Sequence, residues 1–178
     1  CIRDRTSSVK ADLDKNLVSE LEDGGKLIFI RHAYAPGGGD PNNFNLNDWS
    51  TQRNLSEEGK KQAKSIGKFF IKNEIEIDKV LSIECCRCKE TAKIAFKDYI
   101  TKSFLNSFYS SKFAKNKDKQ VKALKEYIKN YKNNNNENLV LVTHYVLISE
   151  ILNYGSSSGE IVVSDKNFNI IDTQEISY

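Results

Sequence analysis

The sequence contains no long apolar run, and no stretch approaches the ~18 residues that a membrane-spanning helix needs. Its charge is also nearly balanced, because 27 basic and 24 acidic residues leave a net charge of +3 over 178 residues. The basic residues are scattered and do not form the stripe that is typical of nucleic-acid-binding proteins. These absences exclude a membrane-spanning helix and argue against a nucleic-acid partner. They favour a small phosphate or carboxylate as the anionic ligand.

A disulfide framework is also lacking, since three of the four cysteines lie within four positions, at Cys85, Cys86 and Cys88. Neighbours this close rarely meet disulfide geometry, although Cys85 and Cys88 have the spacing of a redox pair. The favoured interpretation is small, partly buried, reduced thiols. A metal site built from these cysteines and the histidines does not match zinc spacings. We therefore predict neither a metal nor an organic cofactor.

Histidine and arginine are rare in this chain, which has two His and five Arg against 22 Lys. Lysine supplies the generic positive charge, so each arginine outside the N-terminal tail suggests a specific role. The planar guanidinium binds an oxyanion with two parallel hydrogen bonds, which an ammonium group cannot do. The search for chemistry therefore starts from Arg31, Arg53, Arg87, His32 and His144.

Short apolar runs alternate with amphipathic helices along the chain. Continuous apolar runs predict buried strands at 27–30, 78–82 and 139–142, and two short strands are expected at 160–164 and 169–172. Apolar residues at helical spacing predict helices over 9–21, from Ser56 onward, and over 87–96, 118–132 and 145–152. The alternation predicts an α/β fold, a three-layer α/β/α sandwich around a mainly parallel sheet. We expect a disordered leader over 1–8 and a single domain over 9–178.

The segment Ala33–Gln52 is a long loop rich in Gly, Pro, Asn and Asp, and ordered loops of this length usually carry function. Arg53 follows it directly. Its side chain either reaches over the site or pairs with Glu57 or Glu58 on the next helix. Trp49 is expected either to line the pocket or to anchor the loop in the core.

Both histidines directly follow a buried strand, His32 after the first and His144 after the third. If these strands are parallel neighbours, the two imidazoles meet at the edge where ligands bind. The second strand ends at Ser82, and Arg87 lies at the start of the helix that follows. Imidazoles and guanidiniums together suit a tetrahedral dianion, and a neutral imidazole can attack phosphorus. The alternative is that each histidine only satisfies a loop carbonyl.

Five motifs follow one another in order: Arg31-His32, then Leu55-Ser56 with Gly59 and Gln62-Ala63, then Ser82 with Arg87 and Glu90-Thr91-Ala92, then Val142-Thr143-His144, and Ser158-Gly159-Glu160. Together they resemble the histidine phosphatase superfamily, which includes phosphoglycerate mutases, acid phosphatases and phosphohistidine phosphatases. The resemblance spans about residues 24–160 and is greatest to small bacterial single-domain members. It implies a phosphoglycerate mutase-like fold.

The resemblance also implies roles for individual residues. His32 would be the nucleophile that becomes phosphohistidine, and Arg31 and Arg87 would hold the phosphoryl oxygens. His144 would donate a hydrogen bond to the same oxygens. Three further residues are candidate substrate ligands: Arg53, Asp40 and Ser82.

The chain departs from the family pattern at two places. Ala33 stands where the family commonly has glycine, which is a small change. In addition, the stretch 104–111 contains no carboxylate, whereas many members have a general acid in this region. Asp40 and Asp48 in the long loop are possible substitutes. Without an acid, alkyl esters should react slowly, because an alkoxide is a poor leaving group. This favours phosphohistidine or another activated phosphate as substrate.

We predict a cofactor-independent phosphatase that acts through phospho-His32 on a small phosphorylated substrate or a phosphohistidine protein. The alternative is a module of the same fold that binds a phosphate ligand with little or no turnover. A mutase is disfavoured because the chain is short and lacks insertions that hold a second phosphate group. The sequence starts at Cys1 rather than Met, and the helix before Gly24 slightly favours an exported protein over a cytoplasmic one. The oligomeric state stays open.

Overall fold

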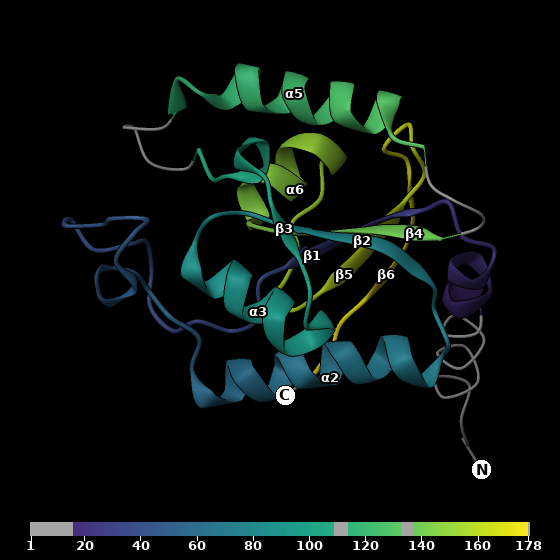
Figure 1. Ribbon diagram of the computed structural model, residues 1–178, viewed down its shortest axis with the longest axis horizontal. Helices are drawn as coiled ribbons and strands as arrows, with labels where there is room; N and C mark the ends of the chain where they lie inside the picture. The colour runs from purple at the N-terminus through teal and green to yellow at the C-terminus, as the bar shows by residue number, and fades with distance from the viewer. Residues whose placement is uncertain (1–15, 109–113, 133–136, 178) are drawn as a thin grey trace, which may run out of the picture.

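The computed structural model describes residues 16–108, 114–132 and 137–177. Their sheet has six strands in the order β3-β2-β4-β1-β5-β6 (Figure 1). The strands are β1 (Leu27–Arg31), β2 (Ile77–Ser82), β3 (Ile100–Thr101), β4 (Asn138–Thr143), β5 (Ile161–Ser164) and β6 (Ile170–Gln174). From β3 to β1 all neighbours pair in parallel, whereas β5 and β6 pair antiparallel at the other edge. The sheet is therefore mixed and mostly parallel.

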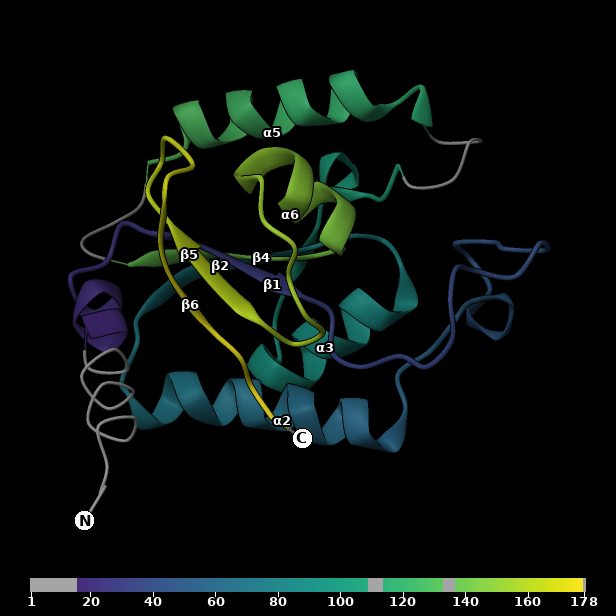
Figure 2. The same ribbon diagram turned by 180° about the vertical axis from the view of Figure 1, so that it is seen from behind.

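Helices cover both faces of this sheet. Figures 1 and 2 show α2 (Glu57–Lys72) and α3 (Cys86–Phe96) on one face, and α5 (Lys117–Asn130) and α6 (Tyr145–Leu152) on the other. Residues 16–22 form a further helical segment. The predicted three-layer α/β/α arrangement is confirmed. It follows from strands whose two faces are both apolar and therefore need a helical layer on each side.

Local signals in the sequence account for the start of α2. The Ser56 hydroxyl accepts a hydrogen bond from the Gly59 N–H at 3.1 Å, and Glu57 and Glu58 in the first turn complement the helix dipole. The residues that α2 buries are Gly59, Gln62, Ala63, Ile66, Gly67 and Phe70. Gly59 and Gln62 hold the N-terminal half of the helix against the loop that follows β1, and Gly67 packs against Ala95 of α3.

Most of the predicted strands and helices form close to their predicted positions. The first four residues of β1 are fully buried, as are all six of β4. The loop 33–52 contains the short turn η1 (Trp49–Thr51), and a second turn, η2 (Ser103–Leu105), precedes α5. The expected leader, 1–8, and residues 9–15 of the first expected helix lie outside the described residues. In the described part of the chain, no helix combines the length and apolar character that crossing a membrane requires.

Candidate active site

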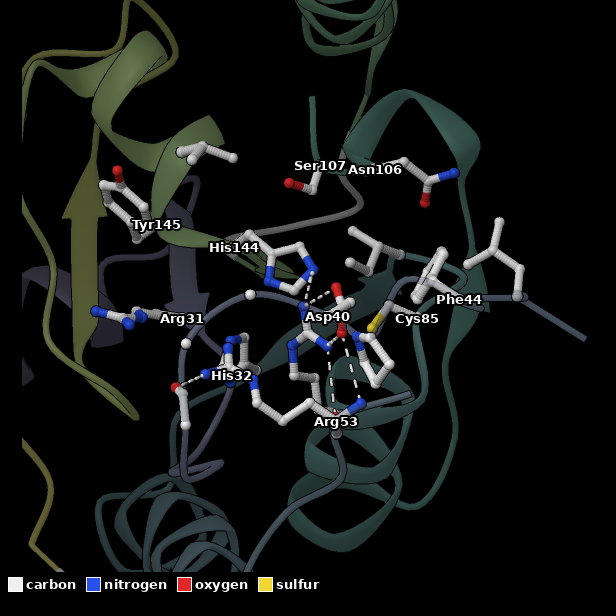
Figure 3. Close-up of a pocket in the computed structure, with 18 of the residues that line it drawn as sticks. Arg31, His32, Asp40, Phe44, Arg53, Cys85, Asn106, Ser107, His144 and Tyr145 are labelled. Carbon is white, nitrogen blue, oxygen red and sulfur yellow. Dashed lines mark hydrogen bonds and ion pairs between the residues drawn. The ribbon is translucent and has the colours of Figure 1, made fainter. Parts of the chain in front are cut away.

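A pocket of about 640 Å³ opens beyond the carboxyl ends of β1, β2 and β4 (Figure 3). This is the end of a parallel sheet at which α/β proteins bind ligands. The loop 37–46 and residues near the start of α5 complete its walls. The charged or titratable residues that line it are Arg31, His32, Asp40, Arg53, Cys85, Arg87, His144 and Tyr145.

The structure brings the two histidines of the chain together at the floor of this pocket. Strands β1 and β4 pair in parallel, with Arg31 opposite Thr143, so the residues that follow both strands are neighbours. The His32 N–H donates to the Thr143 carbonyl at 3.0 Å. The two imidazole centroids lie 5.0 Å apart, with their planes at 83°. Two positions 112 residues apart in the chain therefore form one unit.

One nitrogen of the His32 ring, Nδ1, is hydrogen-bonded to the protein backbone. Its Nδ1 lies 2.8 Å from the Ala33 carbonyl oxygen, which can only accept, so Nδ1 carries the proton. The neutral ring then keeps the lone pair on Nε2. Burial and the nearby Arg87 guanidinium lower the pKa of His32 to about 3. His32 is therefore a neutral imidazole with a free lone pair at physiological pH.

His144 is held by a guanidinium rather than by a carbonyl. Its Nε2 lies 3.3 Å from Nη2 of Arg87, which can only donate, so Nε2 accepts in this structure. Burial lowers the pKa of His144 well below its ordinary value, and His32 and Arg87 lower it further. Both imidazoles are thus neutral. The positive charge of the pocket resides on its arginines.

Arg87 is 4% exposed and binds Asp40 through both terminal nitrogens. The distances are 2.6 Å from Nη1 to Oδ1 and 3.0 Å from Nη2 to Oδ2. This bidentate geometry is the one in which arginine binds phosphate oxygens. Partial burial alone would raise the pKa of Asp40, but the hydrogen bonds from Arg87 hold it below its ordinary value. Asp40 is therefore an anion that occupies the oxyanion-binding face of Arg87.

The other two arginines line the pocket from different sides. Arg31 donates from Nη1 to the Ser156 carbonyl at 2.6 Å, and its guanidinium lies 5.5 Å from the centre of the Tyr145 ring. Figure 3 shows it on the Tyr145 side of the pocket. Arg53 donates from Nη1 to the Gly37 carbonyl and faces the pocket.

These contacts decide between the two predicted positions of the Arg53 side chain, over the site or paired with Glu57 or Glu58. Glu57, its expected alternative partner, accepts instead from Lys60 at 2.7 Å. The Arg53 side chain is directed toward the site and not toward the next helix.

Each of the three arginines has one buried nitrogen atom without a partner in the described part of the chain. The Nε atoms of Arg31, Arg53 and Arg87 are buried and have no hydrogen-bond partner among the described residues. An unsatisfied buried donor costs about 1–3 kcal/mol, more when it is charged. The same three guanidiniums line the pocket, and an anionic ligand there would offset their charge.

Three other residues singled out from the sequence lie elsewhere. Ser82 is fully buried in the sheet, where its hydroxyl donates to the Ile83 carbonyl at 3.1 Å, and it is not among the pocket-lining residues. Asp48 accepts hydrogen bonds from the backbone and side chain of Ser50 and begins the turn η1. Trp49 is 45% exposed and is not among the pocket-lining residues, so it neither lines the pocket nor anchors in the core. The structure thus removes Ser82 and Asp48 from the candidate site.

Polar residues beneath the pocket hold its parts in place, although the sequence shows them only as members of motifs. Thr91 accepts from the Ala33 N–H at 3.0 Å and donates to the Arg87 carbonyl at 2.7 Å, which ties the loop after β1 to α3. Gln62 accepts from the Tyr34 N–H at 2.9 Å and donates to the Ser158 carbonyl at 2.8 Å. Both side chains bridge segments distant in sequence. In the sequence, each of them could be found as a polar residue on the face of a helix that is otherwise apolar.

Two glycines allow these segments to approach one another. A Cβ on Gly59 would lie 2.0 Å from the Tyr34 carbonyl oxygen, so α2 packs directly against the loop that follows β1. Gly159 has φ +72° and donates its N–H to the carbonyls of Arg31 and His32. Only glycine adopts this conformation at little cost. The backbone that carries His32 is thus fixed from two sides.

The cysteines of α3 are free thiols. Cys85, Cys86 and Cys88 are all buried and form no disulfide with one another, which agrees with the prediction that they are small buried side chains and not a disulfide framework. Cys85 lines the pocket, whereas burial raises the pKa of Cys88 well above its ordinary value. Among the described residues, no group of three His, Cys, Asp or Glu side chains is arranged to hold a metal ion. The donor set of the pocket, dominated by guanidiniums, is suited to an anion.

The strand order and the covering helices define an α/β fold shared by phosphoglycerate mutases and histidine phosphatases, and solved structures show this likeness. A phosphoglycerate mutase from Thermus thermophilus matches with a TM-score of 0.59 at 15% identity, over 85% of this chain and 99% of that chain. The protein histidine phosphatase SixA, solved in complex with tungstate, matches with a TM-score of 0.61 at 14% identity, over 85% of this chain and 96% of that chain.

A third similar structure is TTHB049, also from Thermus thermophilus, with a TM-score of 0.60 at 13% identity, covering 85% of this chain and 99% of that chain. No protein-family model and no curated protein matches the sequence. The expected phosphoglycerate mutase-like fold is therefore shown by structure. At this level of identity the likeness concerns the fold alone.

Proposed function

We propose that this chain is a phosphatase that acts through a covalent phosphohistidine on His32. The observation that carries the proposal is the arrangement of a neutral imidazole with a free Nε2 beside three guanidiniums that line the same pocket. A neutral imidazole is a nucleophile, and the guanidiniums stabilise negative charge on phosphoryl oxygens. The tungstate bound to the similarly folded SixA is a tetrahedral oxyanion, which supports the same kind of ligand here.

The first step of the proposed reaction transfers the phosphoryl group to the protein. His32 Nε2 attacks phosphorus, an N–P bond forms, and the bond from phosphorus to the leaving group breaks. The ring gains positive charge, which the hydrogen bond from Nδ1–H to the Ala33 carbonyl stabilises. Arg87, Arg31 and Arg53 bind the phosphoryl oxygens, and His144 lies close enough to His32 to contact the same group.

The second step returns His32 to its starting state. A water molecule attacks phosphorus, the N–P bond breaks, and inorganic phosphate leaves. Excess positive charge in the pocket favours this anionic reaction, because the lining residues include three guanidiniums and, among the described ones, a single carboxylate. The proposed substrate is a small phosphorylated molecule or a phosphohistidine protein.

The test is hydrolysis of p-nitrophenyl phosphate and of phosphohistidine by the wild type and His32→Ala, each with and without EDTA. We expect turnover by the wild type, loss of turnover in His32→Ala, and no effect of EDTA. Rapid quenching at alkaline pH, where phosphohistidine survives, should trap a phosphorylated wild-type protein. Activity that persists in His32→Ala, or that EDTA removes, would contradict the proposal.

A module that binds a phosphate ligand without turnover is the second candidate. The observation that favours it is Asp40, which already occupies the bidentate face of Arg87 and would compete with a substrate. Isothermal titration with tungstate separates the two candidates. Binding of tungstate by a protein that hydrolyses neither substrate would favour the binding module.

A further inference from the structure

We propose that Asp40 is the proton donor to the leaving group, carried on the glycine-rich loop that covers the pocket. This inference rests on the proposed function and adds a catalytic residue to it. Asp40 is the one carboxylate among the described residues that line the pocket. The stretch 104–111, where the family pattern predicts a general acid, contains no carboxylate.

Other carboxylates near this end of the sheet are bound elsewhere. Glu160 accepts from the Tyr154 hydroxyl and from the Ser157 N–H, both at 2.6 Å, and does not line the pocket. Asp48 holds the turn η1 through Ser50, at 3.0 Å from the backbone N–H and 2.7 Å from the hydroxyl. Glu84 accepts from Nδ2 of Asn106 at 2.7 Å and does not line the pocket. Asp40 is thus left as the carboxylate that can reach a bound phosphate.

The position of Asp40 follows from its partner. Both its oxygens bind Arg87, and Nη2 of Arg87 lies 3.3 Å from Nε2 of His144. One guanidinium therefore separates Asp40 from the pair of histidines. The carboxylate occupies the place that two phosphoryl oxygens would take when Arg87 binds them, so substrate and Asp40 exchange at this position.

The exchange changes the affinity of Asp40 for a proton. While it is paired with Arg87, the carboxylate is stabilised as an anion. When a phosphoryl group takes over the guanidinium, Asp40 loses this cation and gains a neighbouring anion. Both changes favour the protonated carboxyl. The side chain therefore becomes an acid only when a phosphate is bound, next to the oxygen atoms that need a proton.

The loop can supply the displacement that this exchange requires. Gly37 has φ +90° and Gly39 φ +68°, and no atom lies within 4 Å of a Cβ placed on Gly38 or Gly39. The Asp40 side chain is 25% exposed at the open side of the pocket. Its carboxylate can move from Arg87 to a leaving-group oxygen without any repacking of the core.

The proposed steps balance. As the His32–phosphorus bond forms and the bond to the leaving oxygen breaks, the Asp40 carboxyl gives its proton to that oxygen, and a neutral alcohol departs. The Asp40 carboxylate then accepts a proton from the water that attacks phosphorus. The proton that Asp40 first donates comes from solvent when the phosphate is bound. The proton that it takes from water returns to solvent when the carboxylate pairs with Arg87 again, and phosphate leaves as the bond to His32 breaks.

The experiment compares leaving groups. Wild type, Asp40→Asn, Asp40→Glu and the control Asp48→Asn are assayed with p-nitrophenyl phosphate, whose phenolate leaves unaided, and with β-glycerophosphate, whose alkoxide needs a proton. We expect the kcat/KM of Asp40→Asn for β-glycerophosphate to fall by about 10²–10⁴-fold relative to its kcat/KM for p-nitrophenyl phosphate, which is the usual contribution of a general acid. The constant kcat/KM reports the steps up to departure of the leaving group, so the later hydrolysis of the phosphoenzyme, which both substrates share, does not enter this ratio. Asp40→Glu should recover part of the loss, and Asp48→Asn should match the wild type.

Three results would overturn the inference. An equal loss on both substrates would make Asp40 a residue that only positions Arg87. Unchanged or increased kcat/KM on both would make it only a competitor for the phosphate site. Wild-type protein that hydrolyses p-nitrophenyl phosphate but not β-glycerophosphate would have no working acid. Failure of the proposed function is distinguishable, because His32→Ala would then keep activity on p-nitrophenyl phosphate whatever stands at position 40.

Discussion

Acidification should destabilise this protein through the buried imidazole of His32. In the unfolded chain His32 binds a proton near its ordinary pKa of 6.5, whereas in the folded protein burial and Arg87 keep it neutral down to about pH 3. Between these two values the unfolded state holds the additional proton. The stabilisation is therefore complete above about pH 6.5 and is lost progressively as the pH falls toward 3.

The size of the effect follows from the separation of the two pKa values. Each pH unit below the unfolded value costs about 1.4 kcal/mol, so His32 alone lowers the free energy of unfolding by about 2 kcal/mol between pH 7 and pH 5. The ring is 2% exposed, so solvent screening is small. His144 is also held neutral and adds to the total loss.

A comparison with His32→Gln isolates the contribution of this ring. Urea unfolding of both proteins at pH 7 and pH 5 should show a loss in the wild type that is larger by about 2 kcal/mol, because glutamine does not titrate. Nitrogen-15 spectra of the imidazole at pH 5 should show a neutral His32 with its proton on Nδ1. Equal losses in the two proteins, or a His32 that titrates near 6.5, would refute the burial argument. Such a result would also remove the basis for a neutral nucleophile.

Three further substitutions test other parts of the site. Arg87→Lys keeps the charge but removes the bidentate hydrogen bonding, so kcat/KM for p-nitrophenyl phosphate should fall by about 10²–10³-fold. A change of only a few fold would show that charge alone suffices. Gly59→Ala places a Cβ 2.0 Å from the Tyr34 carbonyl oxygen. Urea unfolding should show that the free energy of unfolding falls by about 1–3 kcal/mol, and kcat should also fall. Unaltered stability would contradict the close packing. Ser82→Ala should leave kcat unchanged and lower the free energy of unfolding by about 1 kcal/mol, through loss of the hydrogen bond to Ile83; a large loss of kcat would return Ser82 to the site.

In an anion site without its ligand, a carboxylate of the protein itself can pair with the anion-binding arginine, as Asp40 does with Arg87. A carboxylate from a glycine-rich loop can occupy the guanidinium that a substrate is to bind, and it keeps that charge satisfied while the site is empty. An isolated buried guanidinium would be costly. In the mechanism that we propose, the same contact ties substrate entry to the release of Asp40, so that binding and acid catalysis become parts of one exchange.

Much of the fold follows from the sequence alone. The run Leu27–Ile30 predicts a strand with both faces buried, because four consecutive apolar residues leave no side for water. Ser56 followed by two glutamates predicts a helix start, because the cap and the dipole act within one turn. His32 and His144 at strand ends follow from the same local patterns. These features depend on neighbours in the chain, so periodicity and local chemistry suffice to predict them.

The tertiary structure decided which side chains meet. Ser82 lies in β2 between two paired strands, and its buried hydroxyl donates to the Ile83 carbonyl and does not line the pocket. Arg53 and Asp40 reach the site because of the path of a glycine-rich loop, and the φ angles of its glycines are not specified by any local pattern. Asp40 meets Arg87 across 47 positions of sequence. Such contacts depend on how loops and strands pack in three dimensions, which residue order along the chain does not determine by itself.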